Sequence, residues 1–233
     1  MSSPRYATIK EALRSQITQG LLAPGDRVSS ENQLASEFSV SRMTARRALL
    51  ELAEEGVLLR SQGLGSFVAD TRPMSSVTQI RNIAEEITQR GHRHSCCVLQ
   101  HTELPADSLS AMQLGLNTGE LIFHSDIVHM EDGLPIQHES RTVNPRMAPD
   151  YLAQDFANNT PSAYLSAVAP LTEAEQSVEA ILADSDIAKN LQVKKRSPCL
   201  KITRRTFSEK GVVSLAILTH PGDRYRLGSH MNF

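Results

Sequence analysis

The 233-residue sequence has few cysteines, no long apolar run and no marked excess of either charge. Three cysteines, of which Cys96 and Cys97 are adjacent, cannot form a useful disulfide framework, so we interpret them as reduced intracellular thiols. No apolar run approaches the roughly 20 residues that cross a bilayer. The first residues, MSSPRYATIKEALRS, lack the apolar segment of a signal peptide. These absences exclude a disulfide scaffold and predict a cytoplasmic protein with no membrane partner.

Length and composition indicate a folded chain with two domains. A hydrophobic fraction of 40% and a charged fraction of 21% are ordinary for globular proteins. The net charge is -2, and residues 1–72 hold nine basic and eight acidic side chains. Overall charge therefore does not reveal a nucleic-acid partner, and the positions of the charges must decide the question.

The first part of the chain has the pattern of three helices. Apolar residues four apart predict a helix over residues 6–19, and Ser30 is a good N-cap for a short helix over 31–38. Ser41 caps a longer helix that Gly56 ends. The side chains that we expect this third helix to bury are Met43, Ala45, Ala48, Leu49 and Leu52.

A hairpin follows these helices. The β-prone runs Val57–Arg60 and Ser66–Ala69 flank a Gly63–Gly65 turn. Residues 73–79 have the composition of a linker. Residues 1–72 are thus predicted to form a winged helix-turn-helix domain.

The third helix carries cations on its leading turn, where a recognition helix enters the major groove. Arg42, Thr44, Arg46 and Arg47 lie there, while its glutamates lie near the far end. Arginine binds guanine edges, and threonine contacts thymine methyl groups. The alternative interpretation is that these arginines are solvated surface residues paired with glutamates. Their combination with helix-turn-helix spacing and a glycine-rich hairpin favours DNA binding.

The run LAPGDRVSSENQLASEFSVSRMTARRALLELAEEGVLLRSQGLGSFV resembles the winged domain of the GntR superfamily. The resemblance implies that the third helix reads bases or phosphates and that the wing around Gln62-Gly63 enters the minor groove. Gly63 and Gly65 would let the backbone approach DNA closely, although simple turn geometry explains them equally well. The residues that we expect to contact double-stranded operator DNA are Ser30, Glu31, Asn32, Ser41, Arg42, Thr44, Arg46, Arg47, Arg60, Gln62, Gly63 and Gly65.

The remainder alternates helices with antiparallel hairpins, an α+β pattern. Helices are predicted over residues 81–90, Ser108–Leu114, Pro161–Val168 and Glu173–Leu182. Strands are predicted over Cys96–Glu103, Ile122–Met130, Leu134–Val143, Leu200–Ser208 and Val212–Thr219.

Residues 76–233 resemble the effector-binding, UTRA-type domain of the HutC branch of that superfamily, whose fold is similar to chorismate lyase. The stretches RNIAEEITQRGHRH, EDGLPIQHESRTVNPRMAPDYLAQDF and PLTEAEQSVEAILA carry the resemblance, with the ending HPGDRYRL. The resemblance implies a homodimeric repressor of histidine-degradation genes that urocanate releases from its operator. The domain boundaries we predict are 1–72, 73–79 for the linker and 80–233.

Urocanate carries a carboxylate and an imidazole, so its pocket needs cationic donors at one end and polar groups at the other. Arg81 and Asn82 open a predicted helix, and Glu139 could accept an imidazole N–H. The residues that we expect to bind the effector are Arg81, Asn82, His129, Glu139, Ser162, Tyr164, Ser214 and His220. Arg81 also fits a surface charge, and His129 or Tyr164 a buried side chain with satisfied hydrogen bonds.

Three other kinds of site have less support in the sequence. His92, His94, Cys96 and Cys97 are too crowded to form a tetrahedral zinc site alone, so no metal and no cofactor are predicted. An amino-sugar phosphate is the alternative effector, but Arg81 alone supplies few cations for a phosphate. No nucleophile–base pair emerges, so we predict that the protein is not an enzyme.

Overall fold

The computed structural model describes residues 4–61, 64–70, 72, 74–76 and 80–228. The chain divides into two compact units, Met1–Arg72 and Pro73–Phe233. Within the described residues, no helix is long and apolar enough to cross a membrane.

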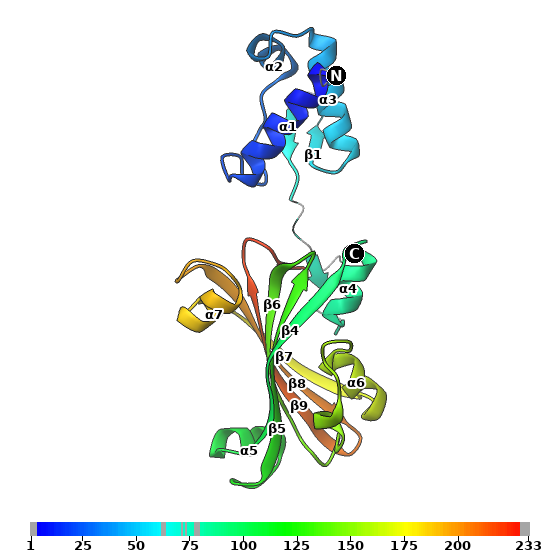
Figure 1. Cartoon of the computed structure of the whole chain (residues 1–233), viewed down its shortest axis with the longest axis vertical. Coiled ribbons are helices and arrows are strands. Elements are labelled where there is room, and N and C mark those ends of the chain that lie inside the picture. Colours follow the sequence, from blue (N-terminus) through cyan, green and yellow to red (C-terminus); the bar gives the residue numbers. More distant parts are fainter. Residues whose placement is uncertain (1–3, 62–63, 71, 73, 77–79, 229–233) are drawn as a thin grey trace. The chain divides into compact units, whose positions relative to one another are not determined.

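The first unit is a three-helix domain with a small antiparallel hairpin (Figure 1). Its helices are α1 (Arg5–Thr18), α2 (Glu31–Glu37) and α3 (Arg42–Glu54), and its strands are β1 (Leu58–Ser61) and β2 (Gly65–Val68). The predicted helix-turn-helix and hairpin are therefore present.

The local signals for the helix starts are satisfied as the sequence predicts. Ser30 forms a capping box with Gln33 at the start of α2, and the Ser41 side chain accepts the Thr44 backbone N–H at the start of α3. The prediction that Met43 is buried is wrong, because its side chain is exposed. Met43 lies about half a turn around α3 from the core face that Ala45, Ala48, Leu49 and Leu52 form.

The second unit is built on a six-stranded sheet in the order β4-β5-β6-β9-β8-β7, with every pair antiparallel. Its strands are β4 (His94–Pro105), β5 (Leu121–Glu131), β6 (Leu134–Val143), β7 (Glu173–Leu182), β8 (Pro198–Ser208) and β9 (Gly211–Pro221). Its helices are α4 (Ile83–Gln89), α5 (Ser108–Leu114), the 3-10 turn η1 (Tyr151–Ala153), α6 (Pro161–Val168) and α7 (Ser185–Asn190).

The helices lie on both faces of this sheet. Figure 1 shows α4 and α6 on one face and α5 and α7 on the other. Tyr151, Phe156 and Leu165 form the core under η1 and α6, and Ile83 and Ile87 pack from α4. The predicted α+β fold with an antiparallel sheet is confirmed.

The helix predicted over Glu173–Leu182 is wrong, because this segment is strand β7. Glutamate, alanine and glutamine favour a helix locally, but the segment pairs with β8 without interruption from Glu173 opposite Phe207 to Leu182 opposite Pro198. Tertiary hydrogen bonding therefore overrides local propensity here.

Three residues of the predicted linker also form a strand. β3 (Met74–Ser76) pairs in parallel with β10 (Arg226–Gly228), so the segment 73–79 is not wholly irregular. A three-residue strand gives almost no periodic signal, and its partner lies about 150 residues away.

Candidate functional site

A polar cleft in the first unit lies between the start of α2, α3 and the hairpin. Its lining includes three arginines, Arg27, Arg42 and Arg60, that reach it from three different parts of the domain. Ser30, Glu31 and Asn32 form the wall at the start of α2. A cleft with several arginines is suited to a polyanion, because each guanidinium can replace a counterion at a phosphate.

Glu31 connects the recognition helix to the hairpin. Its carboxylate accepts Arg42 Nε at 3.0 Å and Arg60 Nη2 at 3.4 Å. The Glu31 side chain is 16% exposed, whereas that of Arg42 is 68% exposed. Glu31 thus binds two arginines from the inner side of the cleft and leaves Arg42 largely open to solvent.

The arginines of α3 divide into two groups. Arg42 and Arg46 lie one turn apart on an exposed side of α3, and Arg46 forms no hydrogen bond or ion pair within the described part of the chain. Arg47 instead donates to Glu51 at 2.9 Å, and its guanidinium lies 4.0 Å above the Tyr6 ring of α1. Arg47 is therefore a surface arginine paired with a glutamate of its own helix, as the alternative interpretation of the sequence had it.

The remaining predicted DNA contacts lie around this surface. Thr44 is half-buried, and its hydroxyl is 2.8 Å from that of Ser41. Gly65 has φ +114°, a backbone conformation that favours glycine, and a Cβ there would lie 3.0 Å from Arg27 Nε, so turn geometry alone accounts for this glycine. Gln62 and Gly63 lie outside the described residues.

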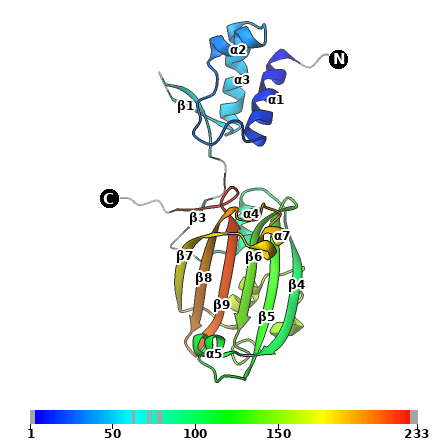
Figure 2. The same ribbon diagram turned by 90° about the vertical axis from the view of Figure 1, so that its left-hand side faces the viewer.

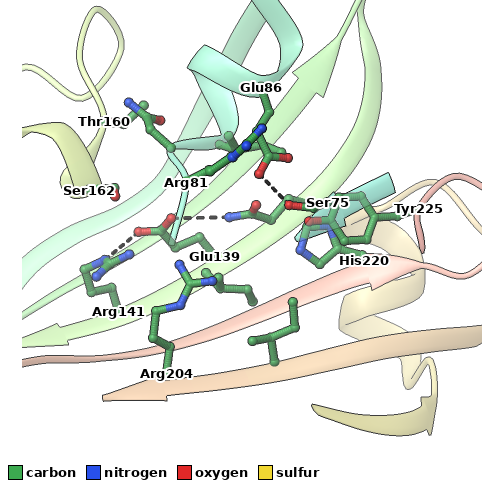
Figure 3. Close-up of a pocket in the computed structure, with 15 residues that line it drawn as sticks. Ser75, Arg81, Glu86, Glu139, Arg141, Thr160, Ser162, Arg204, His220 and Tyr225 are labelled. Atoms are coloured by element: carbon green, nitrogen blue, oxygen red, sulfur yellow. Dashed lines mark hydrogen bonds and ion pairs between the residues drawn. The ribbon is translucent and has the colours of Figure 1, made fainter. Parts of the chain in front are cut away.

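A pocket in the second unit lies between α4 and the sheet. Side chains from α4, β6, β8, β9 and the start of α6 converge on it, as Figure 3 shows. Its lining residues are Ser75, Arg81, Asn82, Ile83, Glu86, Gln137, Glu139, Arg141, Thr160, Ser162, Ile202, Arg204, Leu218, His220 and Tyr225. The free volume at its centre is about 20 Å³, room for about one water molecule. A larger ligand must therefore displace some of these side chains.

A buried ion pair forms one wall of the pocket (Figure 3). Arg141 Nε donates to Glu139 Oε1 at 2.6 Å, and both side chains are about 5% exposed or less. Burial alone would raise the pKa of Glu139, but Arg141 and His129 hold it well below its ordinary value. Glu139 is therefore a permanent anion that can accept a hydrogen bond from a ligand.

Arg204 is the second buried cation of the pocket. Its Nε donates to Gln176 Oε1 at 2.8 Å, and burial, with the nearby Arg141, lowers its pKa. A neutral amide partner compensates the charge less than a carboxylate does, so an anionic ligand beside Arg204 is favoured. Arg81 is exposed at the same pocket and adds a further cation.

His220 and Tyr225 form a neutral aromatic wall. Their ring centroids are 3.7 Å apart and the rings are stacked. Burial lowers the pKa of His220 to about 3, so its ring is neutral at physiological pH. Because its Nδ1 lies 3.0 Å from the Ile136 carbonyl, Nδ1 carries the proton and Nε2 is left as an acceptor.

The comparisons with known proteins agree with both halves of this description. Residues 5–68 match the family described as bacterial regulatory proteins, gntR family, and residues 89–226 match the UTRA domain. A histidine utilization repressor of Pseudomonas putida is 50% identical over 225 residues, covering 97% of this chain and 91% of the relative. The chain belongs to the GntR family of regulators with a UTRA domain.

Two further relatives support this membership. A histidine utilization repressor of Klebsiella aerogenes is 46% identical, covering 97% of this chain and 93% of the relative. The C-terminal domain of a histidine utilization repressor from Pseudomonas syringae is 50% identical, with a TM-score of 0.59, over 60% of this chain and all of that one. This GntR regulator is accordingly a DNA-binding transcriptional regulator and not an enzyme, as the sequence predicts.

Five of the eight predicted effector residues of this GntR regulator line the pocket, namely Arg81, Asn82, Glu139, Ser162 and His220. The Asn82 side chain, however, caps α4 by accepting the Ala84 N–H, so that helix end offers fewer free donors than expected. His129, Tyr164 and Ser214 do not line the pocket.

Two of these three residues, His129 and Ser214, contact side chains that line the pocket. The ring of His129 lies between His94, with Nε2 and Nδ1 3.0 Å apart, and Glu139, with Nε2 and Oε2 3.5 Å apart. The Ser214 hydroxyl accepts Arg141 Nη1 at 3.0 Å. Both residues therefore act on the Glu139–Arg141 pair.

The third residue, Tyr164, belongs to the core. It packs near Tyr151 and Phe156, with ring centroids 6.0 and 6.5 Å away. This is the buried structural role that the sequence left open for Tyr164.

Four polar residues of the pocket were not predicted from the sequence, namely Arg141, Arg204, Glu86 and Ser75. Arg141 lies two residues after Glu139 on β6, so strand alternation alone places both side chains on one face. No such local signal exists for Ser75, whose hydroxyl donates to Glu86 at 2.5 Å from within the expected linker.

The segment with four possible metal ligands is spread over several environments. His92 contacts Asp132, His94 contacts His129, and the Cys96 thiol donates to the Phe156 carbonyl at 3.0 Å. Among the described residues, no group of three such side chains is placed to hold a metal ion.

Proposed function

We propose that this protein is a homodimeric repressor that binds a palindromic, double-stranded operator of histidine-utilisation genes and is released by urocanate. The names of the three relatives above support the choice of pathway. A symmetric dimer presents two recognition helices to half-sites about one helical turn apart.

The pocket chemistry carries the proposal for the effector. Arg204 and Arg81 supply cations for a carboxylate, and the ionised Glu139 supplies an acceptor for an imidazole N–H. Urocanate has both groups, joined by a planar chain that the stacked His220–Tyr225 wall and Ile202 suit.

One observation favours a second candidate more than the sequence did. Three arginines line the pocket where the sequence indicated only Arg81, so an amino-sugar phosphate would find more cations than expected. Arg141 is already paired with Glu139, so a phosphate would have to be bound mainly by Arg81 and Arg204. Urocanate remains the effector we propose, and the experiment compares the two.

The test titrates each compound into the protein bound to a labelled operator fragment and follows fluorescence anisotropy, with calorimetry for direct binding. We expect urocanate to release the operator and glucosamine 6-phosphate to have no effect. Arg81→Ala should weaken urocanate binding about tenfold or more, since charged hydrogen bonds are typically worth 1.5–3 kcal/mol, and should leave operator affinity unchanged. Release by the sugar phosphate and not by urocanate would contradict the proposed effector.

A further inference from the structure

A cluster of cations lies at the end of α7 and in the loop that follows it in the second unit. We call residues 189–196 the basic loop, and its cations are Lys189, Lys194, Lys195 and Arg196. All four side chains are exposed, and within the described part of the chain none of them forms an ion pair. Because the chain as a whole carries a net charge of -2, this loop is a local concentration of positive charge.

The basic loop differs from the nearby sheet, where exposed cations have carboxylate partners. Lys201, shortly after the loop, binds Glu179 at 2.7 Å. The acidic residues of the same segment, Asp184 and Asp186, lie at the other end of α7, where the Asp184 carboxylate caps the helix. An exposed cation without a carboxylate partner can bind a polyanion at little cost, because the polyanion replaces only water and counterions.

The backbone of the basic loop is held in a fixed conformation. Gln192 and Arg196 have φ +52° and +66°, in the left-handed region that residues other than glycine rarely adopt. The Val193 N–H donates to the Ala188 carbonyl at 3.0 Å, and the Arg196 N–H donates to the Ala183 carbonyl at 2.8 Å. The cations are therefore presented on a backbone that binding does not have to order, which lowers the entropy cost of binding.

The basic loop lies at the end of the sheet where the chain enters the second unit. Arg224 Nη1 donates to the Leu191 carbonyl at 2.8 Å, and its Nη2 donates to the Gln192 carbonyl at 3.0 Å. Arg224 lies just before β10, which pairs with β3, and β3 begins two residues after Arg72. Figure 2 shows α7 and β3 at one end of the sheet and α5 at the other. Hydrogen bonds thus connect the basic loop to the segment that follows the first unit in the sequence.

We propose that the basic loop binds the phosphate backbone of DNA beside the operator, so that the second unit adds a sequence-independent contact to the specific contact of the first. Lysine is a compact point charge, and contacts to phosphates position a protein without reading bases. The chain is a DNA-binding regulator, so double-stranded DNA is a polyanion that its first unit already brings to the protein. The proposal rests on the proposed function for the choice of operator fragment.

The apolar residues of the basic loop favour DNA over a lipid surface. Leu191 is buried and Val193 is half-buried. A surface that binds membranes combines its cations with exposed leucine, phenylalanine or tryptophan side chains that enter the lipid. Residues 189–196 offer cations without such an anchor.

The test compares two DNA duplexes by fluorescence anisotropy. The short duplex ends at the operator boundaries, and the long duplex adds about 15 base pairs on each side, roughly one and a half helical turns. The wild-type protein should bind the long duplex at least about fivefold more tightly at low salt, because added phosphate contacts release counterions. The plot of log affinity against log salt concentration should be steeper for the long duplex by about 0.9 for each added contact.

Three double variants assign this difference to the basic loop. Lys194→Gln/Lys195→Gln should bind the long duplex no more tightly than the short one and should keep the wild-type affinity for the short duplex. Lys194→Arg/Lys195→Arg keeps both charges and should retain the difference. Arg146→Gln/Lys210→Gln is the matched control, since it removes two exposed cations near the opposite end of the sheet and should also retain the difference. Circular dichroism and urea unfolding check that all variants remain folded.

The outcomes separate this contact from the proposed function. Equal wild-type affinities for the two duplexes, or a difference that persists in Lys194→Gln/Lys195→Gln, would contradict the contact. An equal loss of affinity on both duplexes would contradict its assignment to DNA beside the operator. Binding to vesicles of equal parts phosphatidylcholine and phosphatidylglycerol that only this variant loses, with DNA binding unchanged, would assign the loop to a lipid surface instead. Failure of the wild-type protein to bind either duplex would contradict the proposed function itself.

Discussion

The cleft of the first unit and the pocket of the second unit both contain arginines, but in opposite environments. The Arg42 side chain is 68% exposed and shares one carboxylate with Arg60. The Arg141 side chain is 5% exposed and is held by Glu139 and Ser214. An exposed guanidinium can exchange its partner for a phosphate at little cost, whereas a buried one must keep its partners.

This difference in burial determines where each substitution should act. Removing an arginine from the cleft should change DNA binding and leave folding almost untouched. Removing the buried Arg141 from the pocket should change folding first, because it leaves its buried partner Glu139 without a compensating charge. The following predictions test this separation, beginning with the largest effect.

Arg141→Ala should lower the free energy of unfolding by about 3–5 kcal/mol, since it leaves the Glu139 carboxylate buried and unpaired. Urea denaturation followed by circular dichroism measures this loss. Arg42→Ala is the control and should change the same quantity by less than about 0.5 kcal/mol. The double variant Glu139→Gln/Arg141→Met should recover much of the loss. Similar free energies of unfolding for Arg141→Ala and Arg42→Ala would contradict the different roles of the buried and the exposed arginine.

Arg46→Ala should weaken binding to the specific operator by about 1–3 kcal/mol, because an exposed arginine without a partner among the described residues is free to read a base. Fluorescence anisotropy with operator and scrambled DNA measures the change. Arg47→Ala is the matched control on the same helix. Arg47 is bound to Glu51 and lies over Tyr6, so this variant should lose little operator affinity. A larger loss for Arg47→Ala would show that the wrong face of α3 has been assigned.

Acidification should destabilise the second unit through His220. Burial lowers the pKa of this residue to about 3, below the ordinary value of 6.5, so the unfolded chain binds more protons between these values. Stability from neutral His220 is therefore present above pH 6.5 and is lost as the pH falls. Between pH 6.5 and 5.5 the loss is about 1 kcal/mol. Urea unfolding at both pH values should show a shallower dependence in His220→Gln, and an equal slope would contradict the role of His220.

Glu31→Gln should produce the smallest effect, a decrease of about 0.5–1 kcal/mol in the difference between the free energies of operator and non-specific DNA binding. Removing the carboxylate releases Arg42 and Arg60 and takes one negative charge off the cleft. Affinity for non-specific DNA should rise and affinity for the operator should not, so the ratio between them should fall. Anisotropy titrations at two salt concentrations measure both affinities. An unchanged ratio would mean that Glu31 does not orient the arginines.

The same contrast explains how far the sequence could predict each site. The surface around α3 is built from residues that lie close together in the sequence. The sequence could therefore predict the helix caps Ser30 and Ser41 and the spacing of Arg42 and Arg46. The pocket gathers side chains from Ser75 to Tyr225, and only those with a local signal were found. Arg204 is recognisable only when β8 and β6 are known to lie on either side of β9.

The failures have separate physical causes. The helix predicted over β7 failed because a ten-residue ladder with β8 outweighs the propensities of Glu173, Ala174 and Glu175. His129 and Ser214 were chosen for the right neighbourhood but serve as supports of the Glu139–Arg141 pair. Sequence patterns report which face of a strand a residue takes and do not report which buried layer it occupies.

The short strand β3 contributes Ser75 to the pocket, close in sequence to the end of the first unit. Ser75 lies three residues after Arg72, the last residue of the first unit, and its hydroxyl donates to Glu86 in the pocket wall. Its backbone is paired with β10, and Tyr225, just before β10, lines the same pocket. Ser75 therefore joins the wall of this pocket to the residues that follow Arg72 in the sequence. A ligand that replaced Ser75 as the hydrogen-bond partner of Glu86 would release a residue only three positions after the end of the first unit, so binding in this pocket would alter the very start of the second unit.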